Sequence, residues 1–300
     1  PPRSTLFPYT TLFRSTQFAM LPMNFLTKEK TADYLSTGHW SKAAVKEAKR
    51  YGNIHIAADT EANGVFTRIP EQKEIQLSAS AEYVHYTSNN TIFGTQWQYW
   101  PDLGKAPAVC DMSSDIFSRP FPADKFSMIY AGAQKNLGPS GVTVVAIKDE
   151  FLQKANTDLP TMLSYKTYAE NDSLYNTPPC FSIYILDLTL SWIKKHGGLK
   201  AIYESNNEKQ KILYSAIDNS AGYYRCPVEK NSRSWMNVVF RLPTEELEEK
   251  FIKESKAAGI IGVKGHRSVG GIRFSIYNAS SVQNIKDSVA FMDDFKNKNK

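Results

Sequence analysis

The chain has 300 residues, a length that suits one large domain or two smaller ones with a substantial buried core. Hydrophobic residues make up 42% and aromatic residues 12%, which is typical of a globular protein and excludes an intrinsically disordered one. The formal net charge is +6, but the sequence has no basic stripe with interleaved aromatic residues, so a nucleic-acid-binding surface is not predicted. A basic balance equally suits acidic small-molecule substrates.

The three cysteines, Cys110, Cys180 and Cys226, are widely spaced and odd in number. They match neither a zinc-ligand spacing nor a disulfide framework, so we predict no metal site and a reducing, cytoplasmic compartment. No apolar run approaches the length of a membrane span, and no membrane partner is expected.

The first fifteen residues read PPRSTLFPYTTLFRS and repeat the element Thr-Leu-Phe. They show neither helical nor strand periodicity and lack the apolar core of a secretory signal. We expect residues 1–15 to be a leader that is not native to the fold, with the true N-terminal part missing.

Further along, the sequence predicts a helix over residues 42–49, with Ser41 as its cap and Gly52 as its stop. An Asn-rich loop is expected at residues 88–91, and a turn at 138–141. Short apolar runs in this part of the chain predict strands. These strands are residues 53–57, 83–87, 108–111, 127–130 and 142–147.

In the C-terminal part, an amphipathic helix is predicted over residues 181–196, ended by Gly197 and Gly198. Thr244 is expected to cap an acidic helix start, which suits the helix dipole. The remaining predicted elements are helices at 199–219, 245–258 and 282–295 and strands at 238–242 and 271–276. Strands that alternate with helices indicate an α/β architecture, and we place a domain change near residue 197.

Asp111 and Lys135 are the most informative pair. Each follows a predicted strand, and ligands of α/β folds gather at the carboxyl ends of strands. A lysine that forms a Schiff base and a carboxylate that keeps a pyridine nitrogen protonated are what pyridoxal phosphate chemistry needs. Taken singly, the lysine is a common surface charge and the aspartate is a helix cap, so the pair has to be considered together.

Four motifs carry a family resemblance, which extends from residue 16 to residue 295. The segments are AGAQKNLGPSG at 131–141, DMSS at 111–114, YNTPP at 175–179 and KGHRSVGGIR at 264–273. They resemble, respectively, the lysine motif, the aspartate turn, the partner-subunit motif and the substrate motif of the phosphoserine aminotransferases. This family has the fold-type I, pyridoxal phosphate-dependent architecture. The resemblance implies a large domain over residues 16–196, with a mixed, mostly parallel sheet flanked by helices, and a smaller C-terminal α/β domain over 197–300.

The resemblance also implies roles for single residues. Lys135 would form the Schiff base and shuttle the proton, and Asp111 would pair with the pyridinium nitrogen. Trp40 would stack on the cofactor ring, Thr91 would bind near its phenolic oxygen or phosphate, and Gln134 would contact the phosphate. The family's Gly-rich phosphate segment is replaced here by residues 11–15, of which Ser15 alone could still serve.

Other implied contacts concern the neighbouring subunit and the substrate. Asn176 and Thr177 would reach the cofactor phosphate of the partner in a homodimer. His266, Arg267 and Arg273 would hold the substrate's phosphate and carboxylate, because arginine forks bind such anions with two hydrogen bonds. On sequence alone, Trp40 reads equally as a core residue, Thr91 as a turn residue and the cationic residues as surface charges.

The resemblance implies an enzyme that transfers an amino group between glutamate and 3-phosphohydroxypyruvate to give 2-oxoglutarate and phosphoserine. Such an enzyme serves serine biosynthesis, and family members often also accept a related phosphorylated 2-oxo acid of pyridoxine biosynthesis. Two alternatives stay open. One is an N-terminally truncated, catalytically impaired fragment of that enzyme, and the other is a different fold-type I aminotransferase or lyase.

Overall fold

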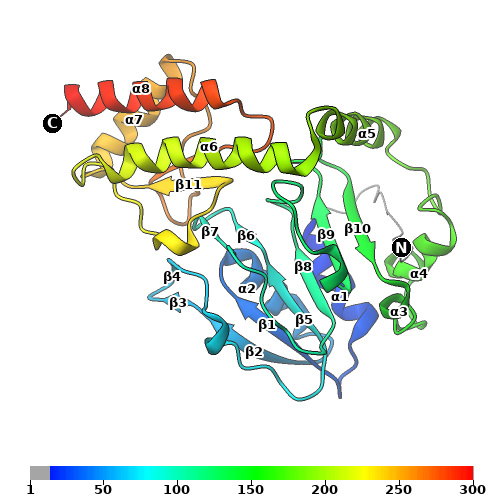
Figure 1. Cartoon of the computed structure of the whole chain (residues 1–300). Helices are drawn as coiled ribbons and strands as arrows, with labels where there is room; N and C mark the ends of the chain where they lie inside the picture. The colour runs from blue at the N-terminus through cyan, green and yellow to red at the C-terminus, as the bar shows by residue number, and fades with distance from the viewer. Residues whose placement is uncertain (1–13, 300) are drawn as a thin grey trace.

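The computed structural model describes residues 14–299, and its largest feature is a six-stranded sheet (Figure 1). The strand order is β10-β9-β8-β5-β1-β2, and all neighbours run parallel except β10, which is antiparallel to β9. The six strands are β1 (Thr31–Ser36), β2 (Asn53–Asp59), β5 (Ala81–Thr87), β8 (Ala108–Asp111), β9 (Met128–Gly132) and β10 (Thr143–Ile147). This mixed, mostly parallel sheet confirms the predicted α/β fold class.

The chain leaves β1 toward β2 on one side and reaches β5 on the other, so the strand order reverses between β1 and β5. In open α/β sheets the crevice outside the carboxyl ends at such a reversal is the usual ligand site. Three two-stranded units complete the strands. They are β3 (Glu61–Ala62) with β4 (Val65–Phe66), β6 (Asn89–Asn90) with β7 (Thr95–Gln96), and β11 (Asn237–Phe240) with β12 (Ile272–Ser275).

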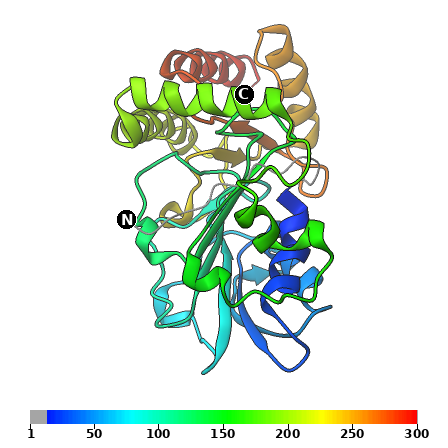
Figure 2. The same cartoon turned by 90° about the vertical axis from the view of Figure 1, so that its right-hand side faces the viewer.

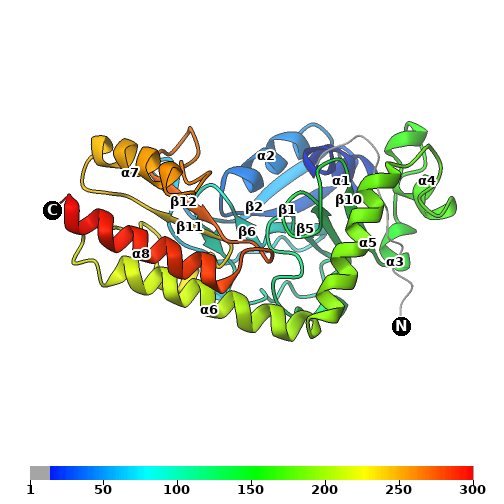
Figure 3. The same cartoon turned by 90° about the horizontal axis from the view of Figure 1, so that it is seen from above.

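Both faces of the sheet are buried, because side chains of successive strand residues point to opposite faces. Tyr34 and Tyr130 belong to the core cluster on one face, whereas their neighbours Leu35 and Ala131 belong to the cluster on the other. α1 (Gln17–Phe25) and α2 (His39–Ala48) pack on each other and close the first face (Figure 3).

The other α-helices are α3 (Asp149–Leu152), α4 (Tyr165–Glu170), α5 (Cys180–Lys195), α6 (Gly198–Asp218), α7 (Glu245–Ala257) and α8 (Val282–Lys298). The 3-10 helices are η1 (Arg14–Thr16), η2 (Gln72–Glu74), η3 (Ala123–Lys125), η4 (Thr161–Leu163) and η5 (Lys230–Ser232). A third core cluster joins α6, α7 and α8 to β11 and β12, and the Phe251 ring contacts several of its aromatic rings. Figure 2 shows these three helices together at one end of the molecule. The boundary that we placed near residue 197 falls between α5 and α6 and stays a prediction.

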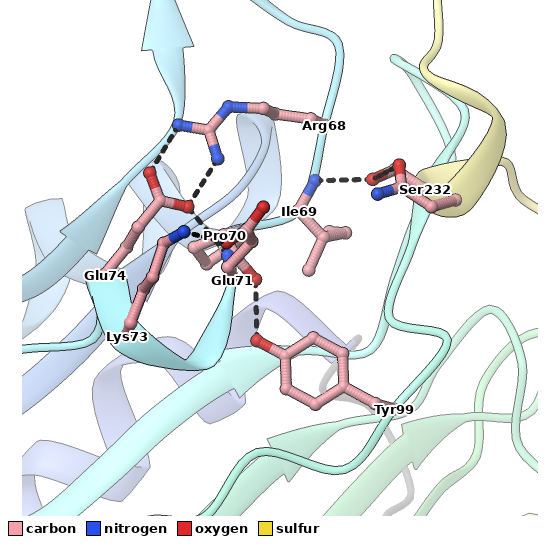
Figure 4. A network of polar contacts seen from close by, with 9 residues as sticks. Arg68, Ile69, Pro70, Glu71, Lys73, Glu74, Tyr99 and Ser232 are labelled. Carbon is pink, nitrogen blue, oxygen red and sulfur yellow. Dashed lines mark hydrogen bonds and ion pairs between the residues drawn. The ribbon is translucent and has the colours of Figure 1, made fainter.

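Polar contacts join the segment that follows β4 to the C-terminal region, which we define as residues 198–298 (Figure 4). The Arg68 guanidinium donates to both carboxylate oxygens of Glu74, at 2.6 and 2.8 Å. That pairing lowers the pKa of Glu74 to about 2. The backbone amide of Ile69 donates to the Ser232 hydroxyl at 3.0 Å.

The structure adds elements that the sequence interpretation missed. The sequence predicted a helix only in the second half of residues 27–52, whereas residues 31–36 form the internal strand β1, next to the edge strand β2. α1 had no prediction at all. The helix predicted from residue 42 begins three residues earlier, at His39. The prediction of Ser41 as the cap is therefore wrong, because Gly38 is the N-cap. Ser41 lies in the first turn, and its hydroxyl accepts from the amides of Thr37 and Gly38 at 2.9 and 3.0 Å.

Several predicted elements agree with the structure. β8 has the predicted bounds, and β5, β9, β10 and α5 to α8 differ from their predicted bounds by a few residues. The Thr244 hydroxyl caps α7 by accepting from the amide of Leu247 at 3.3 Å, as predicted. α6 begins at Gly198. Gly197 therefore lies between the two helices, whereas Gly198 is already part of the second one.

Candidate active site

The predicted site residues are carried by the carboxyl ends of neighbouring strands. Thr87 ends β5 and pairs with Asp111, which ends β8 and in turn pairs with Tyr130 on β9. Lys135 follows three residues after the end of β9. Asp111 and Lys135 are therefore supplied by adjacent strands at one edge of the sheet, beside the reversal in strand order.

Asp111 is buried, with 1% of its surface exposed. Its Oδ1 accepts from the amide of Ser113 at 2.9 Å, and its backbone carbonyl accepts from the Ser88 hydroxyl at 3.2 Å. The next strand supplies His85, whose Nε2 lies 2.8 Å from the Tyr130 hydroxyl. Burial lowers the pKa of His85 to about 4, against the opposing effect of the Asp111 charge. His85 is thus a neutral neighbour of a buried carboxylate.

Lys135 lies in a tight turn between β9 and β10. The Ala133 carbonyl accepts from the amides of Leu137 and Gly138 at 3.1 and 2.9 Å, which closes the turn. Lys135 is half-buried, and the preceding Gln134 is exposed. A lysine presented on a short, hydrogen-bonded turn has its backbone held while its long side chain stays adjustable.

Trp40 and Thr91 meet across the crevice between β1 and β5. The Trp40 indole Nε1 donates to the Thr91 hydroxyl at 3.1 Å. Gly38 makes the close approach possible, because a Cβ at that position would lie 2.3 Å from the Asn90 Oδ1. Trp40 is half-buried and packs against the core cluster on the first face of the sheet.

One cationic residue of the C-terminal region, Arg273, contacts Thr91 as well. Arg273 on β12 donates from Nη1 to the Thr91 carbonyl at 3.3 Å. Among residues 14–299 its buried Nε has no hydrogen-bond partner. The structure therefore brings Arg273 to Thr91, although 182 positions separate them in the chain.

His266 and Arg267 lie on the loop before β12. The His266 Nδ1 is 2.7 Å from the Ser268 hydroxyl, and Arg267 is exposed. Partial burial, together with the nearby Arg273, His39 and Arg267, lowers the pKa of His266. These groups form a cluster of positive or protonatable side chains suited to an anion with more than one charge.

The sequence interpretation missed His39. Its ring lies 4.9 Å from that of Trp40, edge-on, and 6.3 Å from that of His266. His39 is the first residue of α2 and lies between Gly38 and the predicted site residue Trp40. This position, between the end of a strand and the start of a helix, is the signal that could have identified it. His85 was also missed, because its partners are distant in sequence.

The remaining predicted residues lie at the margins of this edge. Ser15 is exposed in η1, which lies beside β9. Asn176 and Thr177 lie on the loop between α4 and α5, where the Asn176 Nδ2 donates to the Thr177 carbonyl at 3.4 Å. Their predicted role is toward a partner subunit, and it stays a prediction. Most of the predicted leader, residues 1–13, lies outside the described residues.

Membrane spans, metal sites and cysteine pairs are three other features considered in the described part of the chain. No helix among the described residues is long and apolar enough to cross a membrane. Within residues 14–299 no group of His, Cys, Asp and Glu side chains could hold a metal ion. Cys110, Cys180 and Cys226 are free thiols.

Comparisons with known proteins agree with this geometry. Residues 11–287 match the family model described as aminotransferase class-V, and the fold is that of this class. A phosphoserine aminotransferase from Herpetosiphon aurantiacus is 56% identical over 281 residues, which are 94% of this chain and 78% of that relative. The solved structure of a phosphoserine aminotransferase from Bacillus circulans subsp. alkalophilus superimposes with a TM-score of 0.97 at 49% identity, covering 100% of this chain and 82% of that one.

A phosphoserine aminotransferase from Trichomonas vaginalis, solved with pyridoxal phosphate bound, is 34% identical with a TM-score of 0.91, and covers 98% of this chain and 83% of that one. The chain belongs to the phosphoserine aminotransferases. The family predicted from the four motifs is thereby confirmed.

The residues at the carboxyl edge fit pyridoxal phosphate. Asp111 offers a buried carboxylate, Lys135 an amine, and Trp40 a half-buried aromatic plane. Within the described part of the chain, the buried hydroxyl of Thr87 beside Asp111 has no hydrogen-bond partner, so a polar group of a ligand would satisfy it.

Proposed function

We propose that this chain catalyses reversible transfer of an amino group from glutamate to 3-phosphohydroxypyruvate, giving 2-oxoglutarate and O-phosphoserine, with pyridoxal phosphate as cofactor. One observation carries the proposal. Asp111 and Lys135 come from the carboxyl ends of neighbouring strands, and Arg273 is bonded to Thr91, whose hydroxyl accepts from Trp40. Cofactor chemistry and recognition of a doubly anionic substrate thus share one site, in a chain of the phosphoserine aminotransferase family.

Bound pyridoxal phosphate supplies an aldehyde that bonds to amines and a ring that accepts the electron pair released at the substrate's α-carbon. Asp111 would keep a proton on the ring nitrogen through a charged hydrogen bond of the strong kind. The Lys135 Nζ holds the cofactor between turnovers, and takes and returns the proton of the substrate's α-carbon. Trp40 orients the ring, and its bond to Thr91 orients the indole.

The remaining proposed contacts bind anions. Ser15 and Gln134 are proposed at the cofactor phosphate, with Asn176 and Thr177 reaching the phosphate of the partner's cofactor. His266, Arg267 and Arg273 bind the substrate's phosphate and carboxylate. A related phosphorylated 2-oxo acid of the pyridoxine route presents the same charges, so both acids are to be assayed side by side.

The test begins with the lysine. Borohydride should fix the cofactor irreversibly on Lys135 of the native chain, and peptide mass spectrometry should find the label there. Lys135→Ala should abolish both the label and the visible absorption, while Lys148→Ala, at a surface lysine that donates to the Asp124 carbonyl, should keep both. A label at another lysine would show that the cofactor is bound there and not at Lys135. A chain that binds no cofactor would instead be the impaired form of the enzyme.

We also propose that the chain acts as a homodimer in the cytoplasm. α5 exposes large apolar side chains at positions 181, 184, 188 and 192, a spacing that places them on one face of the helix. Phe181 is 72% exposed and Tyr184 58%, and both follow closely on Asn176 and Thr177, the residues proposed to face the partner. A second copy is the occupant that would cover this face and use those residues.

Sedimentation of Phe181→Glu and Tyr184→Glu tests this surface. Each variant should shift the native chain from dimer to monomer, because a buried, unpaired charge is costly. Glu208→Gln, which also changes the charge by one unit but at an exposed position of α6, is the control and should leave the dimer intact. A native chain that sediments as a monomer would overturn the dimer proposal.

A further inference from the structure

Three consecutive backbone carbonyls behind the Asp111 turn are each held by the side-chain amide of an asparagine. The three asparagines come from the turn after β9, the end of β12 and the middle of α6, so they are far apart in sequence. All three are buried. The pairs are Asn136 Nδ2 with the Ile116 carbonyl (3.0 Å), Asn278 Nδ2 with the Phe117 carbonyl (3.0 Å) and Asn206 Nδ2 with the Ser118 carbonyl (2.9 Å).

The asparagines are also bonded to one another. The backbone amide of Asn278 donates to the Asn136 Oδ1 at 3.1 Å, and the Asn206 Nδ2 donates to the Asn278 Oδ1 at 2.9 Å. Lys209, one turn along α6, donates to the carbonyls of residues 276 and 277 at 3.1 and 2.8 Å. We call this set, Asn136, Asn206 and Asn278 with the carbonyls of residues 116–118, the asparagine clasp.

The clasp joins the two segments that carry the proposed cofactor residues. Asn136 is the residue after Lys135. The carbonyl of Ile116 that it holds ends a turn beginning at Asp111, since the Met112 carbonyl accepts from the amides of Asp115 and Ile116. A single side chain therefore connects the lysine turn to the aspartate turn by one hydrogen bond.

The backbone at the centre of the clasp is strained. Phe117 has a φ of 55°, a left-handed conformation that is unfavourable for a residue with a Cβ. Such a conformation persists only where its surroundings over-determine it, and here three amides hold the carbonyls before, at and after it. The clasp is thus an arrangement with a required geometry, and a neutral one, which avoids the cost of buried charges.

We propose that Asn136 is a positioning residue that sets the Lys135 amine relative to the Asp111 carboxylate, and that Asn278 and Asn206 hold it in that role. The proposal rests on the proposed function of Lys135 and Asp111. It also extends that function to the C-terminal region, because Asn278 follows β12, the strand that bears Arg273. The position of the substrate-binding strand and that of the cofactor lysine are fixed through the same side chain.

The test uses Asn136→Ala in the cofactor-loaded chain. Loss of both bonds should let the lysine turn shift, and kcat should fall by about 10- to 100-fold, as expected for a misplacement near 1 Å, with KM for each substrate changed much less. The pH midpoint of the bound cofactor's visible absorption should shift, because it reports the surroundings of the Lys135 amine. In the cofactor-free chain, hydrogen exchange at the Asn278 amide should accelerate.

Asn24→Ala is the matched control. Asn24 is also buried and makes three hydrogen bonds to backbone groups, but it joins α1 to the segment at residues 163–165, away from the site. It should lower the melting temperature and leave the absorption midpoint and kcat unchanged. If Asn136→Ala behaves like Asn24→Ala, the clasp is a structural contact only and the proposal is wrong.

A second variant guards against misfolding of the first. Asn278→Ala removes the bond to the Phe117 carbonyl and the bond from Asn206, whereas the backbone amide of residue 278 still donates to the Asn136 Oδ1. It should therefore loosen Asn136 only indirectly and show a smaller shift of the absorption midpoint, in the same direction. No shift in that variant would contradict the proposal. If borohydride still fixes the cofactor on Lys135 in these variants, the proposed function stands, whether or not Asn136 proves to be a positioning residue. Loss of labelling in the native chain would instead refute the function itself.

Discussion

The cofactor edge of the sheet and the substrate loop at residues 264–271 meet at one crevice but are built differently. Asp111 ends a strand that is paired on both sides, and it is buried. Arg267 is exposed on a loop that is closed by a bond from the Gly265 amide to the Gly271 carbonyl, at 2.8 Å. Asp111, which is proposed to act on the cofactor, is thus held by the core, whereas Arg267, which is proposed to bind the substrate, stays in contact with solvent.

The difference has a physical reason. A carboxylate that must hold a proton on a ring gains from a low local dielectric, in which its charged hydrogen bond is stronger. Cationic groups that capture a soluble phosphorylated acid gain from exposure, since long-range attraction steers the encounter. Variants at the two places should therefore fail in different ways: at the cofactor edge in kcat or in stability, and on the loop in KM.

The largest effect is expected for Asp111→Asn. The amide cannot hold the ring nitrogen protonated, so kcat should fall by roughly 10²–10³-fold while some cofactor is retained. Steady-state kinetics with visible absorption as the measure of bound cofactor provide the check. Asp124→Asn, at an exposed aspartate, is the control. Turnover near the native rate in the Asp111 variant would refute its role.

The next effect is on stability, through the buried His85. Its pKa in the folded chain is about 4, below the ordinary value of 6.5, so the unfolded chain binds the extra proton first as the pH falls. Stability should be unaffected by His85 above pH 6.5 and should decrease between pH 6.5 and about 4, by about 3 kcal/mol in all.

Urea unfolding at pH 7 and pH 5 measures that loss. In His85→Gln the group no longer titrates, so the dependence on pH should become shallower, whatever the variant's stability at pH 7. His196→Gln, at an exposed histidine on the end of α5, should keep the native dependence. Equal dependence in all three chains would mean that His85 is not the group responsible.

A smaller effect is expected for Arg267→Ala on the substrate loop. KM for the phosphorylated acid should rise by about 10-fold, in line with the loss of one charge-assisted contact of about 1.5 kcal/mol, and kcat should change little. Thermal unfolding should be nearly unchanged, because the side chain is exposed. A fall in kcat without a rise in KM would place Arg267 with the cofactor edge instead.

The smallest effect concerns His39. Its proximity contributes to the lowered pKa of His266, so His39→Gln should raise the pKa of His266. Titration of the His266 ring by NMR measures the shift directly. His55→Gln, at a histidine on β2 that is bonded to Asp33 on β1, should leave the pKa of His266 unchanged. A pKa of His266 that falls in the His39 variant would contradict this arrangement.

Much of the site could be predicted from sequence because strand ends are local features. The run Ala108–Asp111 and the turn with Lys135 were found from apolar runs followed by polar residues, and β8 has the predicted bounds. Residues 31–36 were missed as a strand. β1 is buried on both faces, so it lacks the alternation of a half-buried strand, and it carries the polar residues Asp33 and Ser36.

What could not be predicted depends on contacts between distant residues. The bond from Arg273 to the Thr91 carbonyl spans 182 positions, and the bonds of the asparagine clasp span 20 to 161. No local pattern marks an asparagine as the partner of a remote carbonyl, because its side chain satisfies a turn equally well. The contact between His85 and Tyr130 could not be predicted for the same reason.

The amino-acid sequence by itself determined the family, the α/β class and the order of the chemical groups along the chain, since these follow from motifs and from local periodicity. Only the tertiary structure decided which of those groups face one crevice, how deeply each is buried, and which neighbours alter their pKa values. Burial and electrostatics arise from atoms brought together by folding, and strand pairing and helix packing across the whole chain set those distances.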